Sequence, residues 1–378
     1  MEIGVLGIFQ NYREGEDDGD VLEGEREIAL LAEELGFDSY WAAEHHFFNY
    51  SMCPDNIQWL TWIAGQTHRI KLGTGAVIMP WNDPYRVAAK MALFDRQSGG
   101  RALLGFGRGL SRREYESFGI SMDEARERFD EGTEIVRRAL DTGFVEADTR
   151  YFQQPRAELR PRATRSFDDR LFAIGVSPES AVRAADLGAR LMVLAQQPWE
   201  VFRDAALIPY QEKWRQRWGS EPPAPVCGQL VYCHEDALIA AERGARYVKN
   251  YFSTVVEHYE IGGKHFGQGY EFYASAAEMI EAIGLDEMAE MYAGVNTFGT
   301  PDQILEKIAE QKRVLNCDLD VLAITKYGGM SGAEARDSMR LFADRVMPAL
   351  RAEEAVSDDD RSGQGDGMMG TSERNANA

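Results

Sequence analysis

Positive charge is scarce in this 378-residue chain, which has 41 lysine and arginine residues against 62 aspartate and glutamate residues. The formal net charge at pH 7 is −21. A surface of that sign repels nucleic acid and anionic lipid, so we expect neither a nucleic acid nor a membrane as a partner. Any phosphate on a ligand must therefore be met by a local group of arginines, serines or backbone N–H groups.

Cysteine is also rare, and long hydrophobic runs are missing. The four cysteines show no CxxC spacing and no regular framework, which predicts free thiols in a cytoplasmic protein. No apolar stretch approaches the length of a membrane span. The first 20 residues contain one short apolar run without a basic segment before it and then turn acidic. We expect a first strand there and not a signal peptide.

Strand-like and helix-like hydrophobic patterns alternate along most of the chain. Helical spacing is clear over 21–36, 178–188 and 301–315. Such alternation predicts parallel strands joined by right-handed crossovers. Eight units in succession favour a closed (β/α)8 barrel, a TIM barrel of the α/β class, over an open sheet. The eight predicted strands are 2–9, 37–43, 70–79, 102–106, 170–176, 190–195, 225–233 and 318–324.

Three stretches fall outside this alternation. Residues 142–168 are rich in Arg and Pro and predict a hairpin inserted between two units. Residues 254–298 predict a long loop before the last β/α unit, which we expect to close over a binding site. Residues 353–378 have almost no apolar periodicity and predict a disordered acidic tail, so the folded domain is 1–352. The glycines expected to hinge the long loop are Gly262, Gly263, Gly267 and Gly269.

The second predicted strand ends at Glu44-His45-His46, and the carboxyl ends of barrel strands are where active sites lie. One histidine there suits acid–base or hydrogen-bonding work, and plain packing at the strand end is the alternative. Adjacent histidines at a strand exit point in different directions. No third histidine, cysteine or carboxylate sits at ligand spacing, so no metal is expected.

Small residues mark the next strand exits. Gly75-Ala76 in the third strand lets a flat ligand approach closely, although ordinary barrel packing would also use such residues. Gly107-Arg108 ends the fourth strand without a P-loop or a dinucleotide-binding spacing. A glycine-flanked arginine there suits a phosphate clamp, with a flexible surface arginine as the alternative.

Two serines open the helix after the fifth strand. Ser177 and Ser180 stand at its start, where serine usually caps the helix. The same position is also an anion site, because unpaired N–H groups and the positive end of the helix dipole point outward. These features lie at consecutive strand exits and are expected on one face of the barrel.

Taken in order, several sequence runs resemble the bacterial-luciferase family, and especially its catalytic subunit. The resemblance covers nearly the whole chain to about residue 350. It implies a TIM barrel and a flavin-dependent monooxygenase. The runs are GFDSYWAAEHHF, KLGTGAVIMPWNDPYR, LFDRQSGGRALLGFGRGLSRREYESFG and SMRLFADRVMPAL.

The resemblance also implies roles for single residues. His45 matches the family's catalytic histidine, and Arg108 matches an arginine that binds the flavin phosphate. Ser177 and Ser180 match the phosphate-binding helix start. The backbone approach to the flavin ring, often through a cis peptide, falls at Gly75-Ala76. The 254–298 segment matches the family's mobile active-site loop.

Some positions depart from the light-emitting enzyme. Gly107 stands where luciferase has a reactive cysteine, and Asp83 replaces a histidine. The loop GVSPES lacks the acidic residue before its first serine. These departures argue against light emission and leave flavin binding in place. Four large aromatics are candidates to wall the ring and the substrate, with plain packing as the alternative for each: Trp41, Phe47, Trp81 and Trp199.

The activity implied is a two-component reaction. A separate flavin reductase would supply reduced FMN, which would react with O2 to give a flavin peroxide that oxygenates a small apolar organic substrate. The chain is expected to form a dimer. Two alternatives are a deazaflavin-dependent oxidoreductase on the same barrel and a non-catalytic flavin-binding subunit. The presence of His45 favours a catalytic chain over the second, because that histidine is absent from luciferase's non-catalytic subunit.

Overall fold

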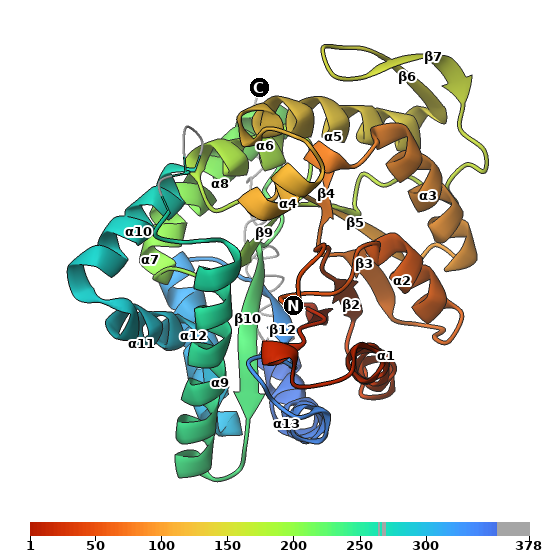
Figure 1. The fold of residues 1–378 in the computed structure, drawn as a ribbon. Helices are drawn as coiled ribbons and strands as arrows, with labels where there is room; N and C mark the ends of the chain where they lie inside the picture. The colour runs from red at the N-terminus through yellow and green to blue at the C-terminus, as the bar shows by residue number, and fades with distance from the viewer. Residues whose placement is uncertain (264, 267–269, 354–378) are drawn as a thin grey trace, which may run out of the picture.

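The computed structural model describes residues 1–353 except 264 and 267–269, and eight parallel strands form its centre. Strand β1 pairs with β12 as well as with β2, and β10 pairs with β9, so the sheet closes into a ring (Figure 1). Each barrel strand overlaps its predicted segment, which confirms the (β/α)8 barrel. The strands are β1 (Ile3–Gly7), β2 (Ser39–Ala42), β3 (Lys71–Thr74), β5 (Ala102–Gly107), β8 (Leu171–Ile174), β9 (Arg190–Leu194), β10 (Val226–Cys233) and β12 (Asp320–Ile324).

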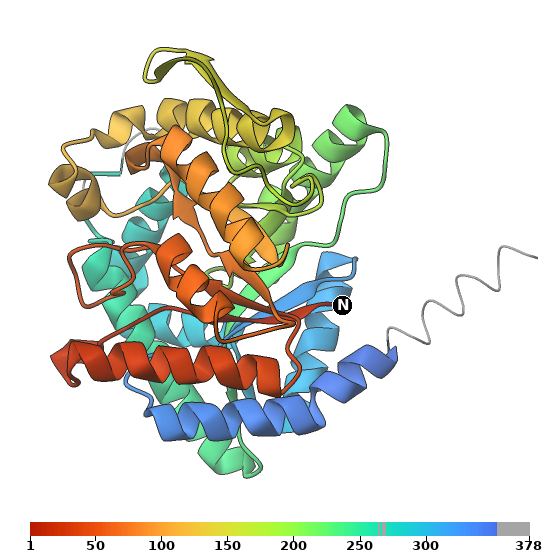
Figure 2. The same ribbon diagram turned by 90° about the vertical axis from the view of Figure 1, so that its right-hand side faces the viewer.

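Helices surround the barrel and cover its outer face (Figures 1 and 2). Many begin at a side chain that caps the first turn, as Asp55 does before α2 and Asp83 before α3. None of the described helices is both long enough and apolar enough to cross a membrane. The main helices are α1 (Asp18–Glu34), α2 (Asn56–Ala64), α3 (Pro84–Gln97), α5 (Ala125–Thr142), α6 (Pro178–Asp186), α8 (Ile208–Trp218), α9 (Ala237–His258), α12 (Pro301–Leu315) and α13 (Gly332–Arg345).

The first insertion is the predicted hairpin. Strands β6 (Phe144–Asp148) and β7 (Gln153–Glu158) pair antiparallel and project from the outside of the barrel beside α5 (Figure 1). The hairpin therefore stands apart from the barrel mouth.

The expectation of a long loop over 254–298 is wrong. Helix α9 continues to His258, and two more helices follow, α10 (Glu271–Ile283) and α11 (Leu285–Val295). Alanine, glutamate and methionine dominate this stretch, and these are strong helix formers whose propensity outweighs the nearby glycines. A short strand, β11 (Thr297–Gly299), then pairs with the end of β10. Gly267, Gly269 and the tail beyond residue 353 lie outside the described residues.

The predicted third strand is broken in the middle. Strand β3 ends at Thr74 and β4 (Val77–Ile78) resumes after the Gly75–Ala76 peptide bond, which is cis, as the family resemblance implies. The buried Asn56 amide donates to the carbonyls of Ala42 (3.1 Å) and Ala76 (3.0 Å). One side chain thus fixes the exits of β2 and β3 relative to each other.

A buried carboxyl group makes the stability of the barrel depend on pH. Glu25 on α1 is 1% exposed, and burial raises its pKa from 4.5 to about 7 although Lys326 opposes the rise. The folded protein therefore binds this proton more tightly than the unfolded chain does. Its contribution to stability is complete below about pH 4.5 and is lost as the pH rises to about 7.

We expect Glu25→Gln to remove this pH dependence. The melting temperature of the wild type should fall relative to that of the variant as the pH is raised through this window, which thermal unfolding in a buffer series measures. Parallel curves for the two proteins would show that Glu25 is not the group responsible.

Candidate active site

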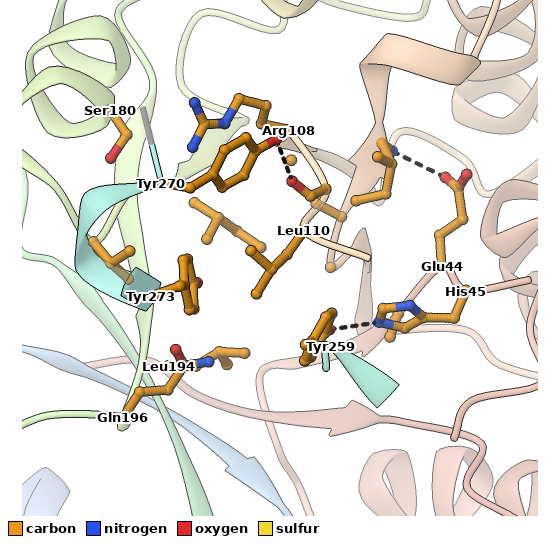
Figure 3. A pocket seen from close by; sticks show the side chains of 18 of the residues that line it. Glu44, His45, Arg108, Leu110, Ser180, Leu194, Gln196, Tyr259, Tyr270 and Tyr273 are labelled. Atoms are coloured by element: carbon orange, nitrogen blue, oxygen red, sulfur yellow. Dashed lines mark hydrogen bonds between the residues drawn. The ribbon is translucent and has the colours of Figure 1, made fainter. Parts of the chain in front are cut away.

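A cavity of about 410 Å³ opens at the carboxyl ends of the barrel strands. That is the end at which barrel enzymes carry their chemistry, and the volume suits a small-molecule site. Arg108 and Ser180 lie on one side of it and His45 on the other (Figure 3). All seven site residues predicted from the sequence line this cavity: His45, Gly75, Ala76, Gly107, Arg108, Ser177 and Ser180.

Two arginines converge on one side of the cavity. Arg108 follows β5, and its guanidinium lies 4.0 Å from the centre of the Tyr270 ring, whose hydroxyl donates to the Gly109 carbonyl. Arg126, from the first turns of α5, lines the same region, and sequence reasoning missed it. Burial, together with the positive charge of Arg108, lowers the pKa of Arg126. Two cations brought together in so acidic a protein mark a place where an anion would be stabilised.

Ser177 and Ser180 cap helix α6 as a reciprocal pair. The Ser177 hydroxyl accepts from the Ser180 N–H at 3.4 Å, and the Ser180 hydroxyl accepts from the Ser177 N–H at 3.1 Å. The capping role is therefore present in the structure. The same helix start also faces the cavity, so the positive end of the α6 dipole lies beside it.

The glycines near the cavity have two different roles. A Cβ added to Gly73 would lie 2.3 Å from the Trp41 ring, so Gly73 serves barrel packing. Gly75 and Gly107 line the cavity itself. A Cβ at Gly107 would lie 2.8 Å from the Ile78 side chain and 3.3 Å from the Ala76 Cβ. A side chain at position 107 would therefore require the end of the Ile78 side chain to move.

Glu44 organises the exit of β2. One of its carboxylate oxygens accepts from the Trp81 indole and the Asn82 amide, each at 2.8 Å, and the other accepts from the Ile78 N–H at 3.0 Å. Nε2 of His46 lies 3.1 Å from the same carboxylate. The Glu44 carboxylate thus ties the β2 exit to β4 and the turn after it.

The two histidines diverge as the strand geometry predicts. Nε2 of His45 lies 3.3 Å from the Tyr259 hydroxyl at the cavity wall (Figure 3). Its Nδ1 lies 3.2 Å from a carboxylate oxygen of Glu114. The His46 ring packs edge-on against Phe118 at 4.8 Å. His45 is the histidine that serves the cavity.

Comparison with known proteins agrees with this geometry. The family model described as luciferase-like monooxygenase matches residues 1–315. This chain belongs to the luciferase-like monooxygenase family. It is therefore an oxidoreductase of a family whose members depend on FMN or on coenzyme F420.

Three relatives match this chain over most of their length. The alkanal monooxygenase alpha chain of Photorhabdus luminescens is 22% identical over 345 residues, which is 87% of this chain and 92% of that protein. The crystal structure of monooxygenase RslO1 from Streptomyces bottropensis is 27% identical with a TM-score of 0.75, covering 93% and 100% of the two chains. The oxygenating constituent of 3,6-diketocamphane monooxygenase from Pseudomonas putida, in complex with FMN, shares the fold with 17% identity, a TM-score of 0.71 and coverage of 92% and 98%.

Some residues at the cavity were not predictable from local sequence. Glu114 lies 69 positions from His45, and Tyr259 lies 214 positions away, so only the folded barrel brings them together. Asp83, where luciferase has a histidine, caps α3.

One of the four candidate aromatics lines the cavity, and the other three do not. Trp81 lines the cavity. Trp41 is buried inside the barrel, Trp199 is buried in the short helix α7 (Trp199–Phe202), and Phe47 is 63% exposed. Large aromatics fill barrel cores and surfaces as well as sites, so residue type alone does not distinguish these places.

Proposed function

We propose that this protein is an FMN-dependent monooxygenase that transfers one oxygen atom from O2 to a small apolar organic substrate. The observation that carries the proposal is the arrangement of one cavity, with Arg108 and Arg126 on one side and the His45 imidazole on the other. Bound reduced FMN would supply the oxygen chemistry itself. The residues of the chain bind and orient it, exclude water and handle protons.

The side of the cavity that would bind the FMN phosphate is the best-defined part of the proposed site. Arg108 and Arg126 supply two guanidinium groups, and α6 points its N-terminus at the same region. Guanidinium binds phosphate through paired charge-assisted hydrogen bonds, and a helix N-terminus favours an anion. These residues fit the phosphate of FMN, and the absence of side chains at Gly75 and Gly107 leaves a face for its flat ring.

The rest of the cavity suits an apolar substrate. Nine leucine, isoleucine and valine side chains line it, which favours burial of hydrocarbon over a charged molecule. A separate flavin reductase would deliver the reduced FMN. The nine side chains are those of Leu6, Ile8, Ile78, Leu110, Ile174, Val176, Leu194, Val201 and Ile324.

Cofactor binding and turnover together distinguish this function from the two alternatives. Titration of the protein with FMN and with a deazaflavin cofactor should show tighter binding of FMN, and addition of reduced FMN, O2 and test substrates should give oxygenated product. Preferential deazaflavin binding with hydride transfer would indicate the F420-dependent class. Flavin binding without any turnover would indicate a non-catalytic subunit.

Ser177→Ala is expected to weaken both folding and cofactor binding. Loss of the α6 cap should lower the free energy of unfolding by about 1 kcal/mol. Loss of a hydroxyl beside the phosphate should weaken FMN binding by about 0.5–1.5 kcal/mol. Thermal unfolding and fluorescence titration measure the two effects separately.

Thr300→Ala is the matched control. Thr300 caps α12 in the same reciprocal way with Gln303, and it does not line the cavity. This variant should lose about 1 kcal/mol of stability and keep its FMN affinity. If both variants bind FMN like the wild type, Ser177 is only a helix cap.

A further inference from the structure

The His45 imidazole belongs to a buried group of three ionisable side chains, here called the Glu114 cluster (His45, Glu114 and His258). Nδ1 of His45 lies 3.2 Å and 3.3 Å from the two carboxylate oxygens of Glu114. Nε2 of His258 lies 3.7 Å from Glu114 Oε2. Glu114 is 1% and His258 4% exposed. Two imidazoles therefore compete for one carboxylate away from water.

Glu114 keeps its negative charge in this setting. Burial alone would raise the pKa of its carboxyl, but His45 and His258 outweigh burial and hold that pKa well below its usual range. The backbone N–H of His46 also donates to Glu114 Oε1 at 2.6 Å. A buried carboxylate needs compensating positive charge or hydrogen bonds. Either imidazole can supply that charge, and a second positive charge would be repelled by the first.

His258 is less readily protonated than an ordinary histidine. Burial lowers its pKa, the Glu114 carboxylate opposes that effect, and the charges of His45 and Arg113 lower it further. The Tyr50 ring stacks on the His258 ring at 4.3 Å. Burial also raises the pKa of Tyr50 and Tyr259 well above the usual value, so both phenols stay neutral. Arg113 is a further charged group close to His258, and it lies 3.5 Å from Glu260.

His258 also borders a second, smaller hollow of about 130 Å³. Its lining includes Arg13, Tyr50 and Glu257, and it does not include His45. His45 borders the cavity and His258 borders the hollow, and the two imidazole rings lie edge to face with their centres 5.3 Å apart. Proton exchange at His258 thus need not pass through the cavity that would hold flavin and substrate.

We propose that Glu114 is the positioning residue for His45 and that His258 sets how readily His45 is protonated by competing for the same carboxylate. The Glu114 carboxylate accepts a hydrogen bond from the Nδ1–H of His45, which leaves Nε2 as the atom that gives or takes a proton at the cavity. When His258 takes up a proton from the hollow, the charge of Glu114 is balanced and a proton on His45 is less favoured. The role in turnover rests on the proposed function, while the competition itself does not.

The competition can be measured without flavin by histidine NMR on the full chain. His45→Gln should raise the pKa of His258, because a competing positive charge is removed. Glu114→Gln should lower the pKa of His258 further, by about 1–3 pH units, because the attracting carboxylate is lost. Glu257→Gln is the matched control, since it neutralises a neighbouring carboxylate outside the cluster and should change little. An unchanged His258 titration in His45→Gln and Glu114→Gln would overturn the proposal.

The pH profile of turnover provides a second test, because two variants should shift it in opposite directions. His258→Gln removes the competitor, so the pH profile of product formation should move to higher pH with KM unchanged. Glu114→Gln should move the profile to lower pH and reduce kcat, and Glu114→Asp, which keeps the charge, should restore part of the rate. Shifts in the same direction for His258→Gln and Glu114→Gln would contradict the competition. Far-ultraviolet circular dichroism confirms that each variant is folded.

The outcomes separate this proposal from the proposed function. Coupled titration without oxygenation would remove the monooxygenase assignment and leave the competition standing. Oxygenation without coupled titration would remove the competition and leave the monooxygenase assignment standing. Dialysis with Zn²⁺ is the third arm, because the three ligand atoms lie within 4.8 Å of one another. Stoichiometric Zn²⁺ retained by the wild type and lost in Glu114→Gln would overturn the proposal, since the cluster would then be a metal centre.

Discussion

Alanine in place of His45 is expected to slow oxygen transfer to substrate by about 10²–10⁴-fold, the usual contribution of a general acid–base group. Its Nε2 lies 3.3 Å from the Tyr259 hydroxyl at the cavity wall, and no other histidine lines this cavity among the described residues. FMN affinity should stay within a few-fold of the wild type, because Arg108 follows β5 and Arg126 lies on α5, away from the β2 exit. Single-turnover oxidation of the reduced complex, with product and hydrogen peroxide quantified, measures the effect.

His46→Ala is the control for that experiment. His46 contacts the Glu44 carboxylate and packs on Phe118, so its loss should reduce thermal stability more than turnover. If His46 is essential and His45 is replaceable, the two roles are reversed. If neither changes the rate, the reaction does not take place at the β2 exit.

Arg108→Ala is expected to weaken FMN binding by about 1.5–3 kcal/mol, the range for hydrogen bonds to charged groups. That corresponds to roughly 10- to 100-fold in Kd. The effect should be large here because the protein carries a net charge of −21 and offers few other cations to a phosphate. Riboflavin, which lacks the phosphate, should bind the wild type more weakly than FMN and should bind the variant about as well as the wild type. Fluorescence quenching gives all four affinities.

Arg128→Ala provides a charge-matched control for Arg108→Ala. Arg128 lies two positions after Arg126 on α5, pairs with Glu124 at 2.8 Å, and does not line the cavity. Its loss changes net charge equally and should leave FMN affinity nearly unchanged. Equal losses in the two variants would mean that long-range charge, and not a clamp at Arg108, governs binding.

Hydrophobic periodicity was sufficient to predict the barrel strands, because each is a short buried run followed by a helical pattern. The strand-exit rule then placed His45, Gly107 and Arg108 on one face, since in a barrel that rule depends only on strand order. It could not find Glu114 or His258. Both lie on helices outside the strand exits, and their contact with His45 depends on how α4 (Arg112–Ser117) and α9 pack. The glycines of the segment before the last unit predict a loop, but its alanine, glutamate and methionine residues favour helix strongly enough to form one.

The hydrogen bonds of Glu44 bear on how this enzyme could be re-engineered. One carboxylate joins His46, Ile78, Trp81 and Asn82, so the residues that flank the histidine and those that follow the cis peptide behave as one block. A substitution within that block disturbs several partners at once. The β8 and β9 side also holds polar residues such as Ser177 and Gln196, but its Ile174, Leu194 and Val201 side chains carry no polar atoms. Directed evolution of substrate scope should therefore find tolerated changes there first, with the block around Glu44 left intact.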